Sequence, residues 1–138
     1  MKKYGFFLYS LILLSSCGKI VYGSKVVPPT STTESPISYT INVDPGAGNI
    51  LAVVGSSQAI NVKVTSTIPT AGVTVGVTVT KDLDNSSVFT TSSSSVTPDN
   101  NITITGLTPG VLCTATIIVA SKSTTSNTKT SIFKLAAK

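Results

Sequence analysis

The chain has 138 residues, with ten Lys and Arg against five Asp and Glu, which gives a formal net charge of +5 at pH 7. It contains no His and no Trp, and its only cysteines are Cys17 and Cys113. The lack of His removes the most common general base near neutral pH and excludes Ser–His–Asp and Cys–His catalytic pairs. We therefore expect a protein that is not an enzyme and that uses no cofactor.

The first sixteen residues have the pattern of a secretory signal peptide. Lys2 and Lys3 give a positive start, and residues 4–14 (YGFFLYSLILL) form an uncharged apolar stretch. This stretch is well short of the roughly 20 residues that a transmembrane helix needs, but it suits the apolar part of a signal peptide. We expect residues 1–16 to be removed from the mature protein.

Residues 14–17 (LSSC) resemble the lipobox of bacterial lipoproteins. In that family the cysteine thiol receives a diacylglyceryl group, the chain is cut before the cysteine, and acyl chains such as palmitate anchor the protein. Each buried CH₂ contributes ~0.8 kcal/mol, so two or three chains hold a protein firmly on a bilayer. The resemblance implies lipidation at Cys17; the alternative is an ordinary signal peptide that happens to contain a cysteine.

Residues 17–36 are expected to form the lipidated cysteine and a linker. The sequence after Cys17, GKIVYGSKVVPPTSTTESP, has three prolines and a Ser/Thr run, which is typical of a disordered, semi-extended tether spanning at most ~60 Å. An alternative is that KIVY (19–22) and KVV (25–27) pair with the sheet edge of a partner. Without the signal peptide the formal charge falls to +3, and the remaining lysines are scattered, so no nucleic-acid partner is expected.

The lipoprotein resemblance also implies a location in the cell envelope. Gly18 follows the cysteine where inner-membrane lipoproteins of enterobacteria tend to have Asp, and Lys19 stands where some surface-exported lipoproteins begin an acidic run. We therefore expect the outer membrane, facing the periplasm. In a source with a single membrane, the outer face of the plasma membrane would be implied instead.

Residues 37–138 alternate between apolar and polar side chains. The clearest case is residues 72–80 (GVTVGVTVT), whose four valines fall on one face of a strand. Further alternation occurs at 37–43, 60–64, 102–104, 113–119 and 133–135, and the segments between carry Pro, Gly, Asn and Asp, which favour turns. The pattern predicts one all-β domain, an antiparallel sandwich of about seven or eight strands. Residues 73–80 carry no charge, so as an edge strand they would need cover from a partner or from the strand before them.

Residues 102–120 (ITITGLTPGVLCTATIIVA) resemble the E-to-F region of fibronectin type III domains. That family has an aliphatic strand, then G-L-x-P-G-T-x-Y, then alternating apolar residues. Gly106, Leu107, Pro109 and Gly110 match, whereas Cys113 stands where the family has a tyrosine that pins the corner. The resemblance implies a structural corner at these five positions and a fibronectin III or immunoglobulin-like sandwich, with Leu107 packed beneath the sheet and Cys113 a small buried hydrophobe.

Two further features bear on ligands. Asp82, Asp84 and Asn85 offer oxygen ligands that could hold a cation weakly, but the segment lacks a Gly at the bend and a closing Glu. The alternative interpretation is a solvated hairpin turn, and we expect no dedicated metal site. Phe133 is expected in the core, and Phe89 is either a core residue or an exposed anchor for a sugar ring.

These observations favour a membrane-anchored envelope lipoprotein with a non-catalytic sandwich that acts as a protein-interaction or scaffold module. The expected partners are the bilayer, through acylated Cys17, and an envelope protein. The alternative is a surface adhesion or glycan-binding module. A row of exposed polar side chains beside Phe89 would favour the glycan; a buried Phe89 with an uncovered strand edge would favour the scaffold.

Overall fold

The computed structural model describes residues 33–138. The signal peptide, Cys17 and the linker up to residue 32, including KIVY and KVV, lie outside the described residues. The described part forms eight strands and contains no helix, and thus none that could cross a membrane. The strands are β1 (Tyr39–Ile41), β2 (Ile50–Val53), β3 (Gln58–Val64), β4 (Val73–Lys81), β5 (Ser87–Ser95), β6 (Asp99–Ile104), β7 (Leu112–Ser121) and β8 (Thr128–Ala137).

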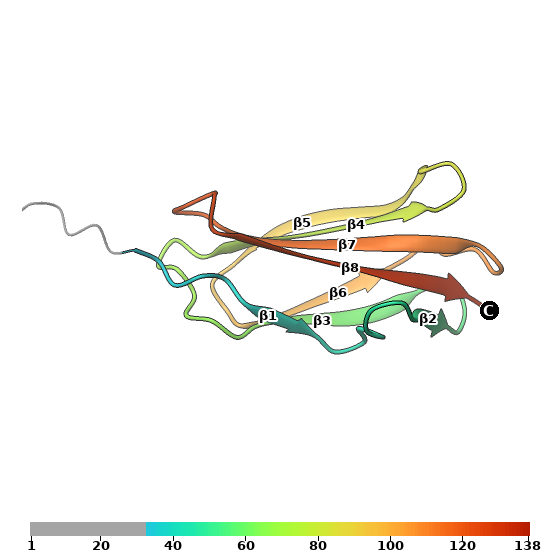
Figure 1. Ribbon diagram of the computed structural model, residues 1–138, viewed down its shortest axis with the longest axis horizontal. Helices are drawn as coiled ribbons and strands as arrows, with labels where there is room; N and C mark the ends of the chain where they lie inside the picture. The colour runs from blue at the N-terminus through green and yellow to red at the C-terminus, as the bar shows by residue number, and fades with distance from the viewer. Residues whose placement is uncertain (1–32) are drawn as a thin grey trace, which may run out of the picture. The chain divides into compact units, whose positions relative to one another are not determined.

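The strands form two layers, which pack face to face (Figure 1). One sheet has three strands in the order β1-β3-β6, and the other has five in the order β2-β8-β7-β4-β5. All neighbouring strands are antiparallel except β2 and β8, which run parallel. This is an immunoglobulin-like β-sandwich, and it confirms the all-β fold class and the strand count expected from the sequence.

The core lies between the sheets and is built from the inward positions of both. All four valines of β4 are fully buried, as their alternation predicted, and they join Ile60 and Val62 of β3 in one cluster. Burying a side chain of this size contributes roughly 1.5–3 kcal/mol, so the alternation itself is the main stabilising feature. Leu107, Cys113 and Phe133 are also buried, as predicted.

Residues 73–80 are not an edge strand, and the cover that they need comes from later strands of the same chain rather than from a partner or from the strand before them. These residues make up most of β4, which pairs with β7 on one side and with β5 on the other. The strand that covers them is Ser87–Ser95, which the sequence pattern did not reveal because it is rich in Ser and Thr on both faces. β5 itself then becomes the outermost strand of the five-stranded sheet.

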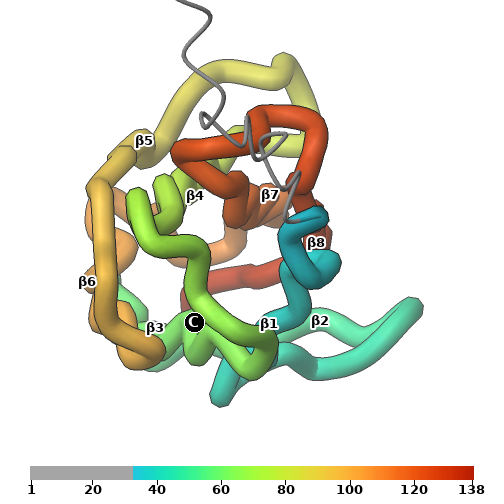
Figure 2. The backbone as a smooth tube through the Cα atoms, turned by 90° about the vertical axis from the view of Figure 1, so that its left-hand side faces the viewer, coloured from blue at the N-terminus to red at the C-terminus, as the bar shows by residue number. Residues whose placement is uncertain are grey.

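The sandwich is elongated along its strands, and the two ends of the described chain lie at opposite ends of it (Figure 1). The chain enters beside the β7–β8 hairpin and ends beside the β6–β7 loop, where Pro109 forms a bridge with Ala137. Viewed end-on, β5 and β6 follow each other along one side of the molecule, where the chain crosses from one sheet to the other (Figure 2).

Candidate functional site

The most open feature of the described domain is the outer edge of β5. This nine-residue strand has one neighbour, β4, so every second residue points its N–H and C=O groups away from the sheet. Within residues 33–138, no hydrogen bond beyond the β4–β5 ladder involves the backbone of residues 89–95. The edge therefore offers a row of donors and acceptors that a further strand could pair with.

The other three edge strands of the described domain are shorter. β1 has three residues, β2 has four and β6 has six. β6 also begins with a charge, Asp99, directly after Pro98, and the amide of its Asn100 donates to the Pro98 carbonyl. Short strands, charged residues and prolines are the features by which native proteins keep the edge of a sheet from pairing with another chain. β5 is the longest edge and carries no charge and no proline.

The β4–β5 hairpin fixes where this edge begins. A β-bulge places Val88 as an extra residue, because Val79 pairs with Phe89 while Thr80 pairs with Ser87. From Phe89 to Ser95 the pairing with β4 is unbroken. The usable edge is therefore residues 89–95, in which Thr90, Ser92, Ser93 and Ser94 are exposed.

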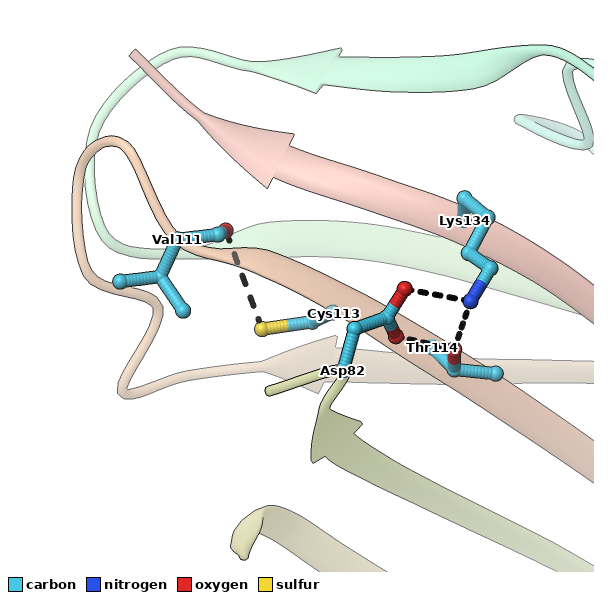
Figure 3. A network of polar contacts seen from close by, with 5 residues as sticks. All are labelled: Asp82, Val111, Cys113, Thr114 and Lys134. Carbon is cyan, nitrogen blue, oxygen red and sulfur yellow. Dashed lines mark hydrogen bonds and ion pairs between the residues drawn. The ribbon is translucent and has the colours of Figure 1, made fainter. Parts of the chain in front are cut away.

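The turn of this hairpin is held to the rest of the sheet by Asp82 (Figure 3). Lys134 of β8 donates from Nζ to Asp82 Oδ2 at 2.5 Å and to Thr114 Oγ1 at 2.7 Å. The hydroxyl of Thr114, on β7, donates to Asp82 Oδ1 at 2.5 Å. Hydrogen bonds from Lys134 and then Thr114 lower the pKa of Asp82 below its ordinary value of 3.8.

This network bears on whether Asp82, Asp84 and Asn85 could hold a cation. Asp82 turns toward Lys134, while Asp84 accepts the backbone N–H of Ser86 at 2.9 Å and so closes its own turn. Asn85 adopts a left-handed conformation with φ 56°. Among residues 33–138 no three Asp, Glu, His or Cys side chains gather where they could hold a metal. A cation at Asp82 would have to compete with the ammonium group already bound there.

The corner residues predicted from the fibronectin III resemblance lie together at the end of the sandwich near the C-terminus. Gly106 and Gly110 both have positive φ, 81° and 76°, so each makes a turn that other residues adopt at a cost. Pro109 forms a bridge with Ala137 at the end of β8. Cys113 points its Sγ toward the Val111 carbonyl at 3.9 Å, and burial raises the pKa of its thiol.

A tyrosine does tie the two sheets together, but from another strand. The hydroxyl of Tyr39 on β1 donates to the carbonyl oxygen of Ile117 on β7 at 2.9 Å. Burial raises the pKa of this hydroxyl above its ordinary value. This contact could not be predicted from the sequence pattern, because the two residues are far apart in the chain and belong to different sheets.

The comparisons with known proteins give a fold-level likeness only. No family model and no curated protein matches the chain. Among solved structures, the sensor domain of the anti-sigma factor RsgI4 of Pseudobacteroides cellulosolvens is 16% identical, with a TM-score of 0.41, covering 72% of this chain and 76% of that one. Murine CRIg is 13% identical, with a TM-score of 0.39, covering 74% of this chain and 98% of that one. Likeness at this level carries no argument about what this chain binds.

Proposed function

We propose that this chain is a lipid-anchored envelope protein whose β-sandwich is a non-catalytic protein-interaction module, and that it binds its partner through the edge of β5. In this proposal the lipid is attached to Cys17, and the protein lies in the outer membrane, facing the periplasm. Support for the anchor comes from the sequence: the positive start, the short apolar stretch and the LSSC motif.

One observation carries the binding role: β5 offers an unbroken seven-residue edge, 89–95, free of charge and proline. An extended segment of a partner could add to it as a sixth strand. Main-chain hydrogen bonds would supply the affinity, and pockets for alternate side chains normally supply specificity. Because the exposed side chains here are Ser and Thr, the partner would be recognised mainly through its backbone conformation.

The region around Phe89 meets one criterion of each function: exposed Ser and Thr side chains follow it along β5, as a glycan site would need, and the strand edge is uncovered, as the scaffold would need. The position of the ring favours the scaffold. The ring is partly buried and packs against the core from the inner face of β5, opposite the buried Val79. It is therefore not presented as a flat platform on which a sugar could stack. This leaves the free edge, rather than an aromatic side chain, as the binding feature of the region.

The fibronectin type III assignment is proposed as the finer family. It is supported by the sequence of the corner at Gly106, Leu107, Pro109 and Gly110. The position of β5 is compatible with it and excludes constant-type, but not variable-type, immunoglobulin domains. This strand extends the larger sheet beyond β4, whereas constant-type immunoglobulin domains place their fourth strand on the other sheet.

The test is to purify the full-length lipoprotein from its native membranes in mild detergent and to identify what accompanies it. The key variant is Ser93→Lys, because a lysine in the middle of an exposed edge blocks addition of a strand. The matched control is Ala59→Lys, which adds the same charge at an exposed position of β3, in the centre of the other sheet.

We expect the wild type and Ala59→Lys to carry a stoichiometric envelope protein that Ser93→Lys loses. If Ser93→Lys keeps that partner, the partner does not bind through the β5 edge. Recovery of the wild type alone would overturn the interaction role. In parallel, Cys17→Ser should move the protein from the membrane fraction to the soluble envelope fraction, and unchanged membrane association would refute the lipid anchor.

A further inference from the structure

The outer face of the five-stranded sheet is a second surface, separate from the β5 edge. Its outward positions carry Thr, Ser, Ala, Gly, Ile and Leu112, and Lys134 is the one charged residue among them in the described strands. That charge is already paired with Asp82. Depletion of charged residues is the compositional mark of the core of a protein–protein interface.

Three isoleucines form a diagonal across this face, here termed the isoleucine stripe: Ile50, Ile132 and Ile118. They come from β2, β8 and β7, which are adjacent in the sheet. Ile50 is level with Lys134 on β8, and Ile118 is level with Thr130, so Ile132 lies between them. Their exposed fractions are 53%, 65% and 42%. Diagonal neighbours on a sheet are ~7–8 Å apart, so the stripe is continuous.

Gly76 continues the stripe on β4, directly opposite Ile118. A glycine inside a strand weakens it, and it often marks a place where another chain approaches closely. The fold itself does not require glycine at this position. Its φ is not positive, and an added Cβ would meet nothing nearer than the Ile118 carbonyl oxygen at 3.9 Å. Because glycine has no side chain, the outer face is lower at this position than at the neighbouring exposed Ile118, and we call this position the hollow over Gly76.

We infer that this face packs against the same face of a second copy of this chain, with isoleucine side chains of one copy entering the hollow over Gly76 of the other. Protrusion and hollow lie side by side on one surface, as an isologous two-fold contact needs. Because the only charge is neutralised within each copy, the pairing brings no like charges together. This inference does not depend on the lipid anchor or on the β5 edge.

The size of the face fits a dimer. Five strands at ~4.8 Å and about seven residues at ~3.3 Å give a face of about 24 by 23 Å, or about 550 Å², so a pair of copies would bury about 1,100 Å² in total. That is just below the range for stable specific protein–protein interfaces, about 1,200–2,000 Å², and in the class of weak, transient contacts. The expected dimer is therefore concentration-dependent rather than permanent.

The test measures the protein mass of the full-length lipoprotein in mild detergent over a range of concentrations, by light scattering coupled to gel filtration. Ile132→Lys places a charge in the middle of the stripe, on a side chain already 65% exposed. Gly76→Val fills the hollow with a residue favoured in strands, so the folded monomer should keep its thermal stability or gain some. Ala59→Lys, on the other sheet, is again the control.

We expect the wild type and Ala59→Lys to dimerise, and Ile132→Lys and Gly76→Val each to weaken the dimer at least tenfold. The Gly76→Val result is decisive, because it pairs weaker association with an undiminished melting temperature of the monomer, measured at a concentration below that at which the dimer forms, and general destabilisation cannot produce this combination. A wild type that stays monomeric throughout overturns the inference. So does a dimer that Ser93→Lys disrupts and these two variants do not, because that dimer would form through the edge.

Discussion

The two sheets share one core, but their outer faces carry different kinds of side chain. On the three-stranded sheet, Asn61 donates through Nδ2 to Asn101 Oδ1 at 2.8 Å, and its backbone N–H reaches Asn42 Oδ1 at 2.7 Å. Lys63 and Asp99 stand opposite each other in the register. Polar groups there satisfy one another and face water. The five-stranded sheet instead exposes Ile50, Ile118 and Ile132.

This difference indicates which side of the sandwich is adapted to solvent alone. Single exposed apolar side chains are common on protein surfaces, but a row of them on adjacent strands beside an interior glycine is not explained by the fold. The three-stranded sheet shows that this sequence can supply ordered polar pairs on an outer face. The five-stranded sheet has few of them, and these lie at its end, around Asp82.

The largest expected effect comes from removing the core that both faces share. Phe133→Ala should lower the free energy of unfolding by about 3–5 kcal/mol, because the ring is almost fully buried between the sheets. Chemical denaturation followed by circular dichroism would measure it. A loss of less than about 1 kcal/mol would mean that the two sheets do not depend on this packing.

A smaller effect on the free energy of unfolding should distinguish the outer faces of the two sheets. Asn101→Ala removes the side-chain hydrogen bond to Asn61 and should cost about 0.5–1.5 kcal/mol. Ile132→Thr, on the other face, should change monomer stability by no more than about 0.5 kcal/mol, because the side chain is mostly exposed. Both are measured by denaturation at a concentration below that of any dimer. Equal costs would remove the distinction between the faces.

The smallest effect concerns pH. The pKa of Asp82 is lower in the folded protein than in the unfolded chain, so its contribution to stability is present above the unfolded value and is lost as pH falls through the folded one. Between about pH 5 and pH 2, the wild type should therefore lose more stability than Asp82→Asn. Because Lys134 and Asp82 are partly exposed, added salt should reduce the difference. Parallel curves for the two proteins would show that the pair contributes nothing.

Local pattern was enough to predict the core but not the sheet order. The valines at 73–79 alternate strictly, and a strand with one buried face must look like that. β5 could not be recognised from alternation, because its inward positions include Thr91, Ser93 and Ser95. At the rim of a sandwich the inner face of a strand is open to water, so its inward side chains need not be apolar. Which strand is outermost depends on pairings between distant segments, and the spacing of apolar residues along the chain does not encode them.

The candidate site shows the same division. From its near neighbours, Asp84 and Asn85, Asp82 is predicted to lie in a solvated hairpin turn or, at most, to bind a cation weakly. In the fold its partner is Lys134, which lies 52 positions further along the chain. The buried state of Leu107 and Cys113, by contrast, follows from local sequence and was predicted correctly. The stripe could have been suspected only once the register placed Ile118, Ile132 and Ile50 on neighbouring strands.

Asn127, in the β7–β8 hairpin, has a mechanical consequence. Its side chain accepts the backbone N–H of Ile37 at 2.9 Å and donates to the Ser35 carbonyl at 3.0 Å and to Glu34 Oε2 at 3.2 Å. A pulling force applied to the chain ahead of Thr33 would load these three bonds before it reached the three-residue β1. The hairpin would therefore transfer the tension to β7 and β8, the two longest strands of the sandwich, and would keep β1, the shortest strand, from being pulled off the sheet first.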